Sequence, residues 1–357
     1  MRQRPFVSLA LLLTTSIGVT GCSQTDFVKC TSTPPPKAGE MLGTFAIHPG
    51  PLQQAIDAEG NVWIASYVDS TVTAMNSAGT VLHTYNTPHP ADSVTIDAAG
   101  NLWLTNQDDN SVTKMSANGA VIGTFLVGEG PDAGAVDTRG HVWITNSGAS
   151  SVTLLDSTGR LIGTYSTGSG SPWNVVIDAE GNAWTDNWTS GTVSKFGPNG
   201  NLLGVYPVGK NPQVLAVDAA GNVWVPNQGD DTVTKLAKDG SQIFTTRVTV
   251  HTPGGLAIDG GGNVWVYGTD TPEIIALDSA GCLLGTFSIG NHSAFATVDG
   301  AGAIWITSFA DGTIHKLSTG STGVVTPAIA ALAHTALGTR ISLKKTQPNE
   351  PKHSSSN

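Results

Sequence analysis

The stretch Asp97-Ala-Ala-Gly-Asn-Leu-Trp-Leu-Thr-Asn106 decides the fold, because variants of it occur seven times along the 357-residue chain. Each copy carries a tryptophan 40 or 41 residues after the previous one, and an aspartate lies six residues before every one of these tryptophans. The tryptophans are Trp63, Trp103, Trp143, Trp184, Trp224, Trp265 and Trp305, and the aspartates are Asp57, Asp97, Asp137, Asp178, Asp218, Asp259 and Asp299. This fixed period predicts a protein built from structural repeats.

Each unit contains four short runs of β-favouring residues separated by turn signals. In the second unit the runs are Val94–Asp97, Leu102–Asn106, Ser111–Met115 and Val121–Val127. Four strands in about 40 residues are typical of a propeller blade, and no helical periodicity interrupts them. We therefore predict an all-β fold, a seven-bladed β-propeller of four-stranded antiparallel blades. The strand around each tryptophan is apolar on both faces, so we expect the indole rings to be buried between adjacent blades.

The repeated aspartate has two interpretations. It precedes a glycine by three residues, as in Asp97 and Gly100, which favours an Asx-type turn with glycine at positive φ. The alternative is a ring of calcium sites, but calcium takes six to eight oxygen ligands and each unit offers one regular carboxylate. The sequence favours the structural role.

The phase of the repeat predicts how the ring closes. A run resembling Leu-Gly-Thr-Phe ends each unit, yet its first copy, Leu42–Phe45, precedes the first tryptophan and no good copy follows the last one. We expect Leu42–Phe45 to be the outer strand of the last blade, paired with the strand around Thr313–Leu317, which removes the open edge. The alternative is that Val324-Val325 supplies that strand.

Composition excludes several classes of protein. Lys and Arg number 17 against 27 Asp and Glu, a formal charge of −10 without any basic run, so we expect no nucleic-acid partner. Charged residues make up 12% and hydrophobic residues 39%, which argues against a highly charged disordered chain. The 43 glycines and the scarcity of Glu and Lys argue against a long helical protein.

The N-terminus predicts export and lipidation. Residues 1–21 have a basic start at Arg2 and Arg4, an apolar stretch and the ending Val19-Thr20-Gly21-Cys22, a signal peptide that resembles the bacterial lipobox. That resemblance implies acylation of Cys22 and anchoring to a lipid bilayer of the cell envelope, with Ser23 favouring the outer membrane, facing the periplasm or the cell surface. Loss of Arg2 and Arg4 changes the charge to −12. An ordinary signal peptide with an incidental cysteine is the alternative.

The domain boundaries follow from these patterns. We expect a tether over residues 22–41, with the run Pro34-Pro35-Pro36. The propeller covers residues 42–317, and a partly disordered tail covers 318–357, with a short helix expected over Thr326–Gly338. With Cys22 lipidated, we expect Cys30 and Cys282 to form a disulfide in an oxidising compartment, the alternative being two free thiols.

The unit Asp-x-x-Gly-Asn-Val-Trp followed by Thr-Val-Thr-Lys-Leu resembles NHL-type repeats and the streptogramin B (virginiamycin B) lyase group of seven-bladed propellers. The resemblance covers residues 42–317. In those lyases activity depends on His at a Pro-His-Gly turn, a Glu and a magnesium ion. The matching turns here are Pro131-Asp132, Pro172-Trp173, Pro212-Gln213 and Pro253-Gly254. None carries His after Pro, and His89 and His292 are out of register.

In a propeller, the loops from fourth to first strand and from second to third strand share the face around the channel mouth, where we expect a ligand site. The candidate residues on the first set of loops are Asp92, Asp132, Trp173, Asn174 and Gln213, and those on the second set are Asn106, Asn146, Asn187, Trp188 and Asn227. An aromatic pair beside amides and carboxylates suits a sugar, a peptide or a small amphipathic ligand. The alternative is that Trp188 caps a neighbouring blade and the asparagines close turns.

Three functions remain open at this point. We expect no cofactor, and a binding or scaffolding module of the cell envelope with a protein, peptide or glycan ligand is the first hypothesis. The second is a lyase-like or lactonase-like enzyme with a divalent metal on Asp92, Asp132 and Asn174 and a bound water as nucleophile. The third is a purely structural envelope protein.

Overall fold

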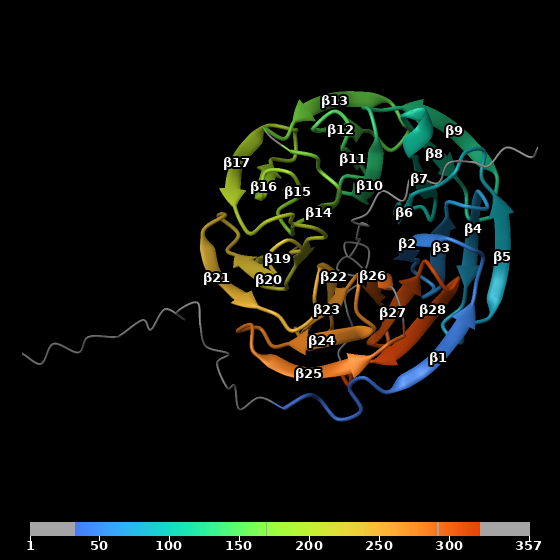
Figure 1. Cartoon of the computed structure of the whole chain (residues 1–357). Coiled ribbons are helices and arrows are strands. Elements are labelled where there is room, and N and C mark those ends of the chain that lie inside the picture. Colours follow the sequence, from blue (N-terminus) through green and yellow to red (C-terminus); the bar gives the residue numbers. More distant parts are fainter. Residues whose placement is uncertain (1–32, 169, 291–292, 322–357) are drawn as a thin grey trace, which may run out of the picture.

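The strands form seven four-stranded sheets arranged as a closed ring (Figure 1), so the chain is a seven-bladed β-propeller, as the repeat predicts. This computed structural model describes residues 33–168, 170–290 and 293–321. Within each blade the first strand lies nearest the axis and the fourth lies at the rim. The described residues contain one short helix, the 3-10 turn η1 (Gln107–Asp109).

The blades follow the chain in order. Blade 1 is β2 (Pro51–Ile56), β3 (Val62–Ser66), β4 (Thr71–Met75) and β5 (Val81–Asn86); blade 2 is β6 (Ser93–Ile96), β7 (Leu102–Asn106), β8 (Ser111–Met115) and β9 (Val121–Leu126). Blade 3 is β10 (Pro131–Val136), β11 (Val142–Asn146), β12 (Ser151–Leu155) and β13 (Leu161–Ser166); blade 4 is β14 (Val175–Ile177), β15 (Ala183–Asn187), β16 (Thr192–Phe196) and β17 (Leu202–Pro207). Blade 5 is β18 (Ala216–Val217), β19 (Val223–Asn227), β20 (Thr232–Leu236) and β21 (Gln242–Arg247); blade 6 is β22 (Pro253–Ile258), β23 (Val264–Gly268), β24 (Glu273–Leu277) and β25 (Leu283–Ser288).

Blade 7 joins the two ends of the ring. It comprises β26 (Ser293–Val298), β27 (Ala303–Ser308), β28 (Thr313–Ser318) and, from the N-terminal side, β1 (Met41–Ala46). β1 pairs antiparallel with β28, with Phe45 opposite Ile314, which confirms the predicted closure; Val324-Val325 lies outside the described residues. The pairing continues beyond β1, because Gly39 N donates to Ser318 O at 2.8 Å and Ser318 N donates to Glu40 O at 2.9 Å.

The seven repeated tryptophans form the contacts between blades. Their exposed fractions do not exceed 4%. Every indole Nε1–H donates to the carboxylate six residues upstream, at 2.8 to 3.4 Å. The same carboxylate accepts backbone N–H groups of its own turn, as Asp97 does from Ala99 and Asn101. The aspartates are therefore structural, as the sequence favours, because their oxygens hold the turn and the indole.

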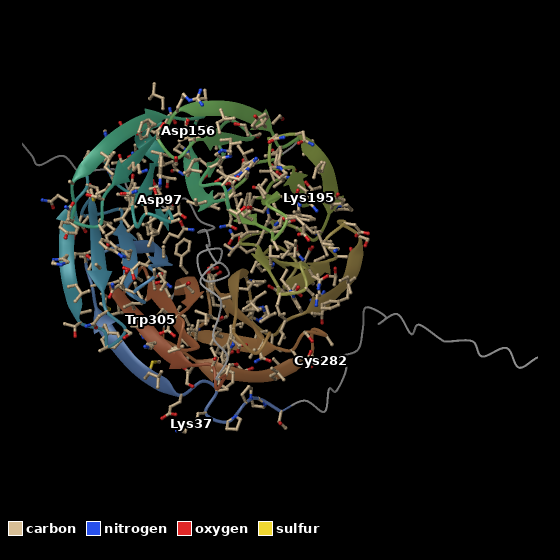
Figure 2. The ribbon with its side chains drawn as sticks, turned by 180° about the vertical axis from the view of Figure 1, so that it is seen from behind. Lys37, Asp97, Asp156, Lys195, Cys282 and Trp305 are labelled. Carbon is tan, nitrogen blue, oxygen red and sulfur yellow. The ribbon has the colours of Figure 1, made fainter. Side chains whose placement is uncertain are left out.

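Four blades add a lysine to this pair, buried in two of them and half-buried in the other two. The ammonium lies 4.5 to 4.6 Å from the indole centroid and pairs with the same aspartate. The lysines are Lys114, Lys195, Lys235 and Lys316, and Figure 2 shows Lys195 within its blade. Each ammonium also donates to a backbone carbonyl of the following blade. These side chains therefore connect neighbouring sheets directly.

Candidate functional site

The candidate site lies where the inner strands begin, on the face shared with the loops between second and third strands; we call it the mouth face. Its innermost positions lie five residues before the repeated aspartates. In blades 1 to 6 they are Leu52, Asp92, Asp132, Trp173, Gln213 and Gly254. The inner strands of blades 4 and 5 are short, starting at Val175 and Ala216. In blade 4 the backbone before β14 is therefore available to side-chain acceptors, whereas in blade 5 Gln213 N still donates to Pro226 O at 2.9 Å.

Carboxylates gather on blades 2 and 3 at this face. Gln107 connects two of them, because its backbone N donates to Asp92 Oδ2 at 3.0 Å and its Nε2 donates to Asp132 Oδ1 at 2.5 Å. Tyr67 of blade 1 donates its hydroxyl to Asp108 Oδ2 at 3.0 Å. The structure therefore brings together Asp92 and Asp132, as predicted, and adds Asp108, Gln107 and Tyr67; we call this group the acidic arc.

The environment of the acidic arc disfavours additional negative charge. Burial raises the pKa of Asp92 to about 8; the charges of Asp132 and Asp108 add to the rise, and the Gln107 backbone N–H opposes it. Burial also raises the pKa of Tyr67 to about 12, supported by its hydrogen bond to Asp108 and by that group's charge. Asp92 is therefore a carboxyl group that holds its proton at neutral pH and releases it just above.

A second carboxyl group, Asp186, lies under the tryptophan pair. It is fully buried, and its Oδ1 accepts backbone N–H groups of Trp173 at 3.3 Å and Asn174 at 2.6 Å. These bonds replace strand pairing at the shortened start of β14. Burial raises the pKa of Asp186 well above its ordinary value. Asp186 is not among the site residues predicted from the sequence, although it is an aspartate inside an apolar strand, where blades 2 and 3 have Thr105 and Thr145.

Trp173 and Trp188, the two tryptophans outside the repeat, lie together on blade 4. Their ring centroids are 5.9 Å apart and the ring planes are inclined by 36°. Both Nε1 atoms are buried without a hydrogen-bond partner. Asn211 Nδ2 of blade 5 donates to Trp188 O at 3.2 Å, which holds the loop. The predicted aromatic pair is thus formed, and it presents two indole donors that the protein does not satisfy.

An apolar cluster crosses the ring beside this pair. Trp173 packs with Leu52 of blade 1, Val214 of blade 5, and Phe295 and Phe309 of blade 7. Residues from four blades meet here, although the repeat spreads them over the whole chain. The mouth face is therefore divided: blades 2 and 3 carry the acidic arc, and blades 1, 4, 5 and 7 contribute the apolar cluster.

The four strand-end asparagines have a different role from the predicted one. Asn106, Asn146, Asn187 and Asn227 are at most 1% exposed, and each Nδ2 donates to two hydroxyls on the third strand of its own blade. Buried amides occupied in this way cannot contact a ligand, so these residues close turns, which was the alternative interpretation. Asn174 is also fully buried, and Gln213 Nε2 faces Gln228 Oε1 at 3.4 Å. We leave these six residues out of the candidate site.

A divalent metal on Asp92, Asp132 and Asn174 belongs to the enzyme hypothesis, and a disulfide is predicted for Cys282. Within the described ranges, no group of three or more His, Cys, Asp and Glu side chains could hold a metal ion, and the Asn174 side chain is fully buried. Cys282 is disulfide-bonded, and its predicted partner Cys30 lies outside the described residues, as does Cys22. Figure 2 shows Cys282 at the rim of blade 6.

Comparison with known proteins supports the architecture. The chain superposes on a streptogramin B lyase with a TM-score of 0.71 at 14% identity, covering 77% of this chain and 96% of that one. It shares a propeller fold with the streptogramin B lyases. The virginiamycin B lyase from Staphylococcus aureus gives a TM-score of 0.71 at 15% identity over 77% and 98% of the two chains. Hydrazine synthase from Kuenenia stuttgartiensis gives 0.67 at 14% identity over 76% and 96%.

These likenesses concern the fold alone. No family model matches the chain, and no curated protein matches it. His89, which is out of register with the histidines of the lyases, pairs with Asp109 at 2.6 Å; His292 lies outside the described residues. No helix in the described part of the chain is long and apolar enough to span a membrane.

Proposed function

We propose that this protein is a lipid-anchored binding module of the bacterial cell envelope that takes a peptide or a small amphipathic ligand on its mouth face. One observation carries the binding role: Trp173 and Trp188 lie ring to ring with both indole N–H groups buried and unpartnered. Unsatisfied buried donors are rare in folded proteins, and aromatic rings with a polar edge are typical of ligand sites.

The surroundings of the tryptophan pair support the same role. The apolar cluster gives a ligand a surface to pack on, and the acidic arc gives it polar partners. The anchoring role depends on the lipobox-like ending Val19-Thr20-Gly21-Cys22, and several acyl chains give stable membrane attachment. Together these features support the proposal of a receptor held near a membrane.

Site-specific photocrosslinking in whole cells tests the binding role. A benzophenone side chain at Phe309, on the mouth face, is expected to capture a defined partner or ligand. The same group at Ala99, in a turn on the opposite face, is the matched control. Equal crosslinking at both positions, or none at Phe309, contradicts the proposal. Metabolic labelling with an alkyne fatty acid tests the anchor, which Cys22→Ser is expected to abolish.

A streptogramin lyase-like or lactonase-like activity is the second candidate. The observation that favours it is Asp92, a half-buried carboxyl whose pKa of about 8 is suited to proton transfer near neutral pH. Incubation with virginiamycin B, followed by mass spectrometry with and without a chelator, tests this activity. Turnover that Asp92→Asn removes supports the enzyme; an unchanged substrate contradicts it.

A further inference from the structure

The mouth face combines negative charge with aromatic surface, and this combination selects among ligands. The charged groups that act most strongly on Asp92 are both negative, Asp132 and Asp108. Asp108 in turn accepts the hydroxyl of Tyr67, whose ionisation Asp92 and Asp108 oppose. Ionising Asp92 therefore adds a third negative charge to the acidic arc, beside Asp108 and Asp132. A cation placed against the arc reverses this repulsion.

Unpartnered buried donors provide the second, independent observation. The indole N–H groups of Trp173 and Trp188 lack acceptors. Donors without partners match a ligand that offers carbonyl groups, as a peptide backbone does.

We propose that the mouth face binds a peptide through a basic side chain, with the ammonium or guanidinium group held by Asp92, Asp108 and Asp132 and the adjoining apolar part on the Trp173–Trp188 pair. This inference rests on the proposed binding function and names its ligand class. Aromatic faces attract cations as well as apolar groups, so both halves of the site favour the same ligand. A nucleic acid would be repelled by the carboxylates, and a neutral glycan would lack the positive charge that the repulsion among them favours.

Binding of the cation is coupled to a proton. At pH 7 Asp92 holds its proton, since its pKa is about 8. A guanidinium group against the arc favours the ionised carboxylate, so the proton leaves as the ligand binds. The groups that face Asp92 are Asp132, Asp108, Tyr67 and the Gln107 backbone N–H. We therefore expect the affinity to rise between pH 6 and pH 9.

The test uses the full-length protein in detergent, labelled with 5-fluorotryptophan, and two probes that differ only in charge. Acetyl-Phe-Arg-amide carries a guanidinium group, and acetyl-Phe-citrulline-amide is its neutral counterpart. Trp173→Phe and Trp188→Phe assign the two fluorine signals. We expect the arginine probe to shift both signals and to bind at least tenfold more tightly than the citrulline probe at pH 7. Calorimetry in two buffers of different ionisation enthalpy should show proton release.

Asp92→Asn should reduce the preference for arginine to less than threefold and remove the proton release. Asp69→Asn, an exposed aspartate paired with His48, is the control and should change neither. Equal affinity for both probes with shifts at Trp173 and Trp188 overturns the basic-peptide inference and leaves the binding function standing. No shift with either probe at millimolar concentration also overturns the inference, and the photocrosslinking experiment then decides the binding function by itself.

Discussion

Asp92→Asn should make the protein more stable at high pH and leave it nearly unchanged at pH 4. The folded protein holds the pKa of Asp92 at about 8, against an ordinary value of 3.8. Between these values the folded state binds a proton that the unfolded state has lost, so stability falls as pH rises through this window. Asparagine removes the titration and keeps an acceptor oxygen for the Gln107 backbone N–H.

The magnitude follows from the displacement of the pKa. Each unit corresponds to about 1.4 kcal/mol, so four units give an upper bound of about 6 kcal/mol at pH 9 and roughly 4 kcal/mol at pH 7. Water that reaches the partly exposed carboxylate reduces these figures to about half. The stability difference between Asp92→Asn and the parent protein is therefore expected to grow by about 2 to 3 kcal/mol from pH 5 to pH 9.

Urea unfolding followed by tryptophan fluorescence at pH 5, 7 and 9 measures this difference. Asp156→Asn is the matched control: hydrogen bonds from Thr158 and Arg160 lower the pKa of this exposed carboxyl, so its contribution is present above its ordinary pKa and lost as pH falls below that value. The control should show no growth between pH 5 and pH 9. A pH-independent effect of Asp92→Asn would refute the assignment of Asp92 as a desolvated acid.

Three further predictions concern the scaffold. Lys235→Met removes the ammonium that pairs with the half-buried Asp218 at 3.2 Å, and the carboxylate keeps its bonds from Asn222 and Trp224. This change should lower the free energy of unfolding by about 2 kcal/mol, whereas Lys210→Met, 79% exposed, should change it by less than about 0.5 kcal/mol; urea titration compares them. Phe45→Ala removes the ring that contacts Trp305 in the blade that closes the ring, and it should lower the free energy of unfolding by about 2 kcal/mol. Leu126→Ala, at a residue that is 80% exposed, is the control. Equal melting temperatures for the two variants would contradict the role of β1 in closure. Burial lowers the pKa of His315, and the charge of Asp311 opposes this shift. The contribution of His315 to stability is therefore present above pH 6.5 and lost as pH falls below that value. His315→Gln should make the melting temperature less dependent on pH between pH 7 and pH 5.

The fold was predictable because one short sequence pattern is repeated seven times and each copy predicts one blade. The spacing of aspartate and tryptophan fixes the turn, the second strand and the buried ring of every blade, and the displaced copy at Leu42–Phe45 fixes the closure. The observed β7 and β8 have the expected bounds, and β6 and β9 differ from them by one residue at their ends. Repetition averages out the local ambiguity that limits assignment of single strands.

The site was only partly predictable, because it depends on which side chains from different blades converge. The period places Asp92, Asp132, Trp173 and Trp188 on one face correctly, but it does not give the direction of a side chain at the end of a strand. The asparagines turn inward to hydroxyls of the third strand, such as Ser111 and Thr113 of blade 2. The apolar cluster brings together residues from blades 1, 4, 5 and 7. These residues lie far apart in the sequence, and a local sequence pattern does not predict contacts between them.

Blade 7 takes its outer strand from the start of the chain and its other three strands from the end, so the wheel is complete only once Ser318 has been made. A chain that ends before Thr313 leaves Met41–Ala46 without its hydrogen-bonding neighbour and Phe45 without the cover of Ile314. Such fragments carry an unprotected β-edge, which is prone to pairing with other chains. Closure of the ring therefore depends on the last strand of the repeat region, and a truncated chain differs from a complete one by the exposed edge of β1.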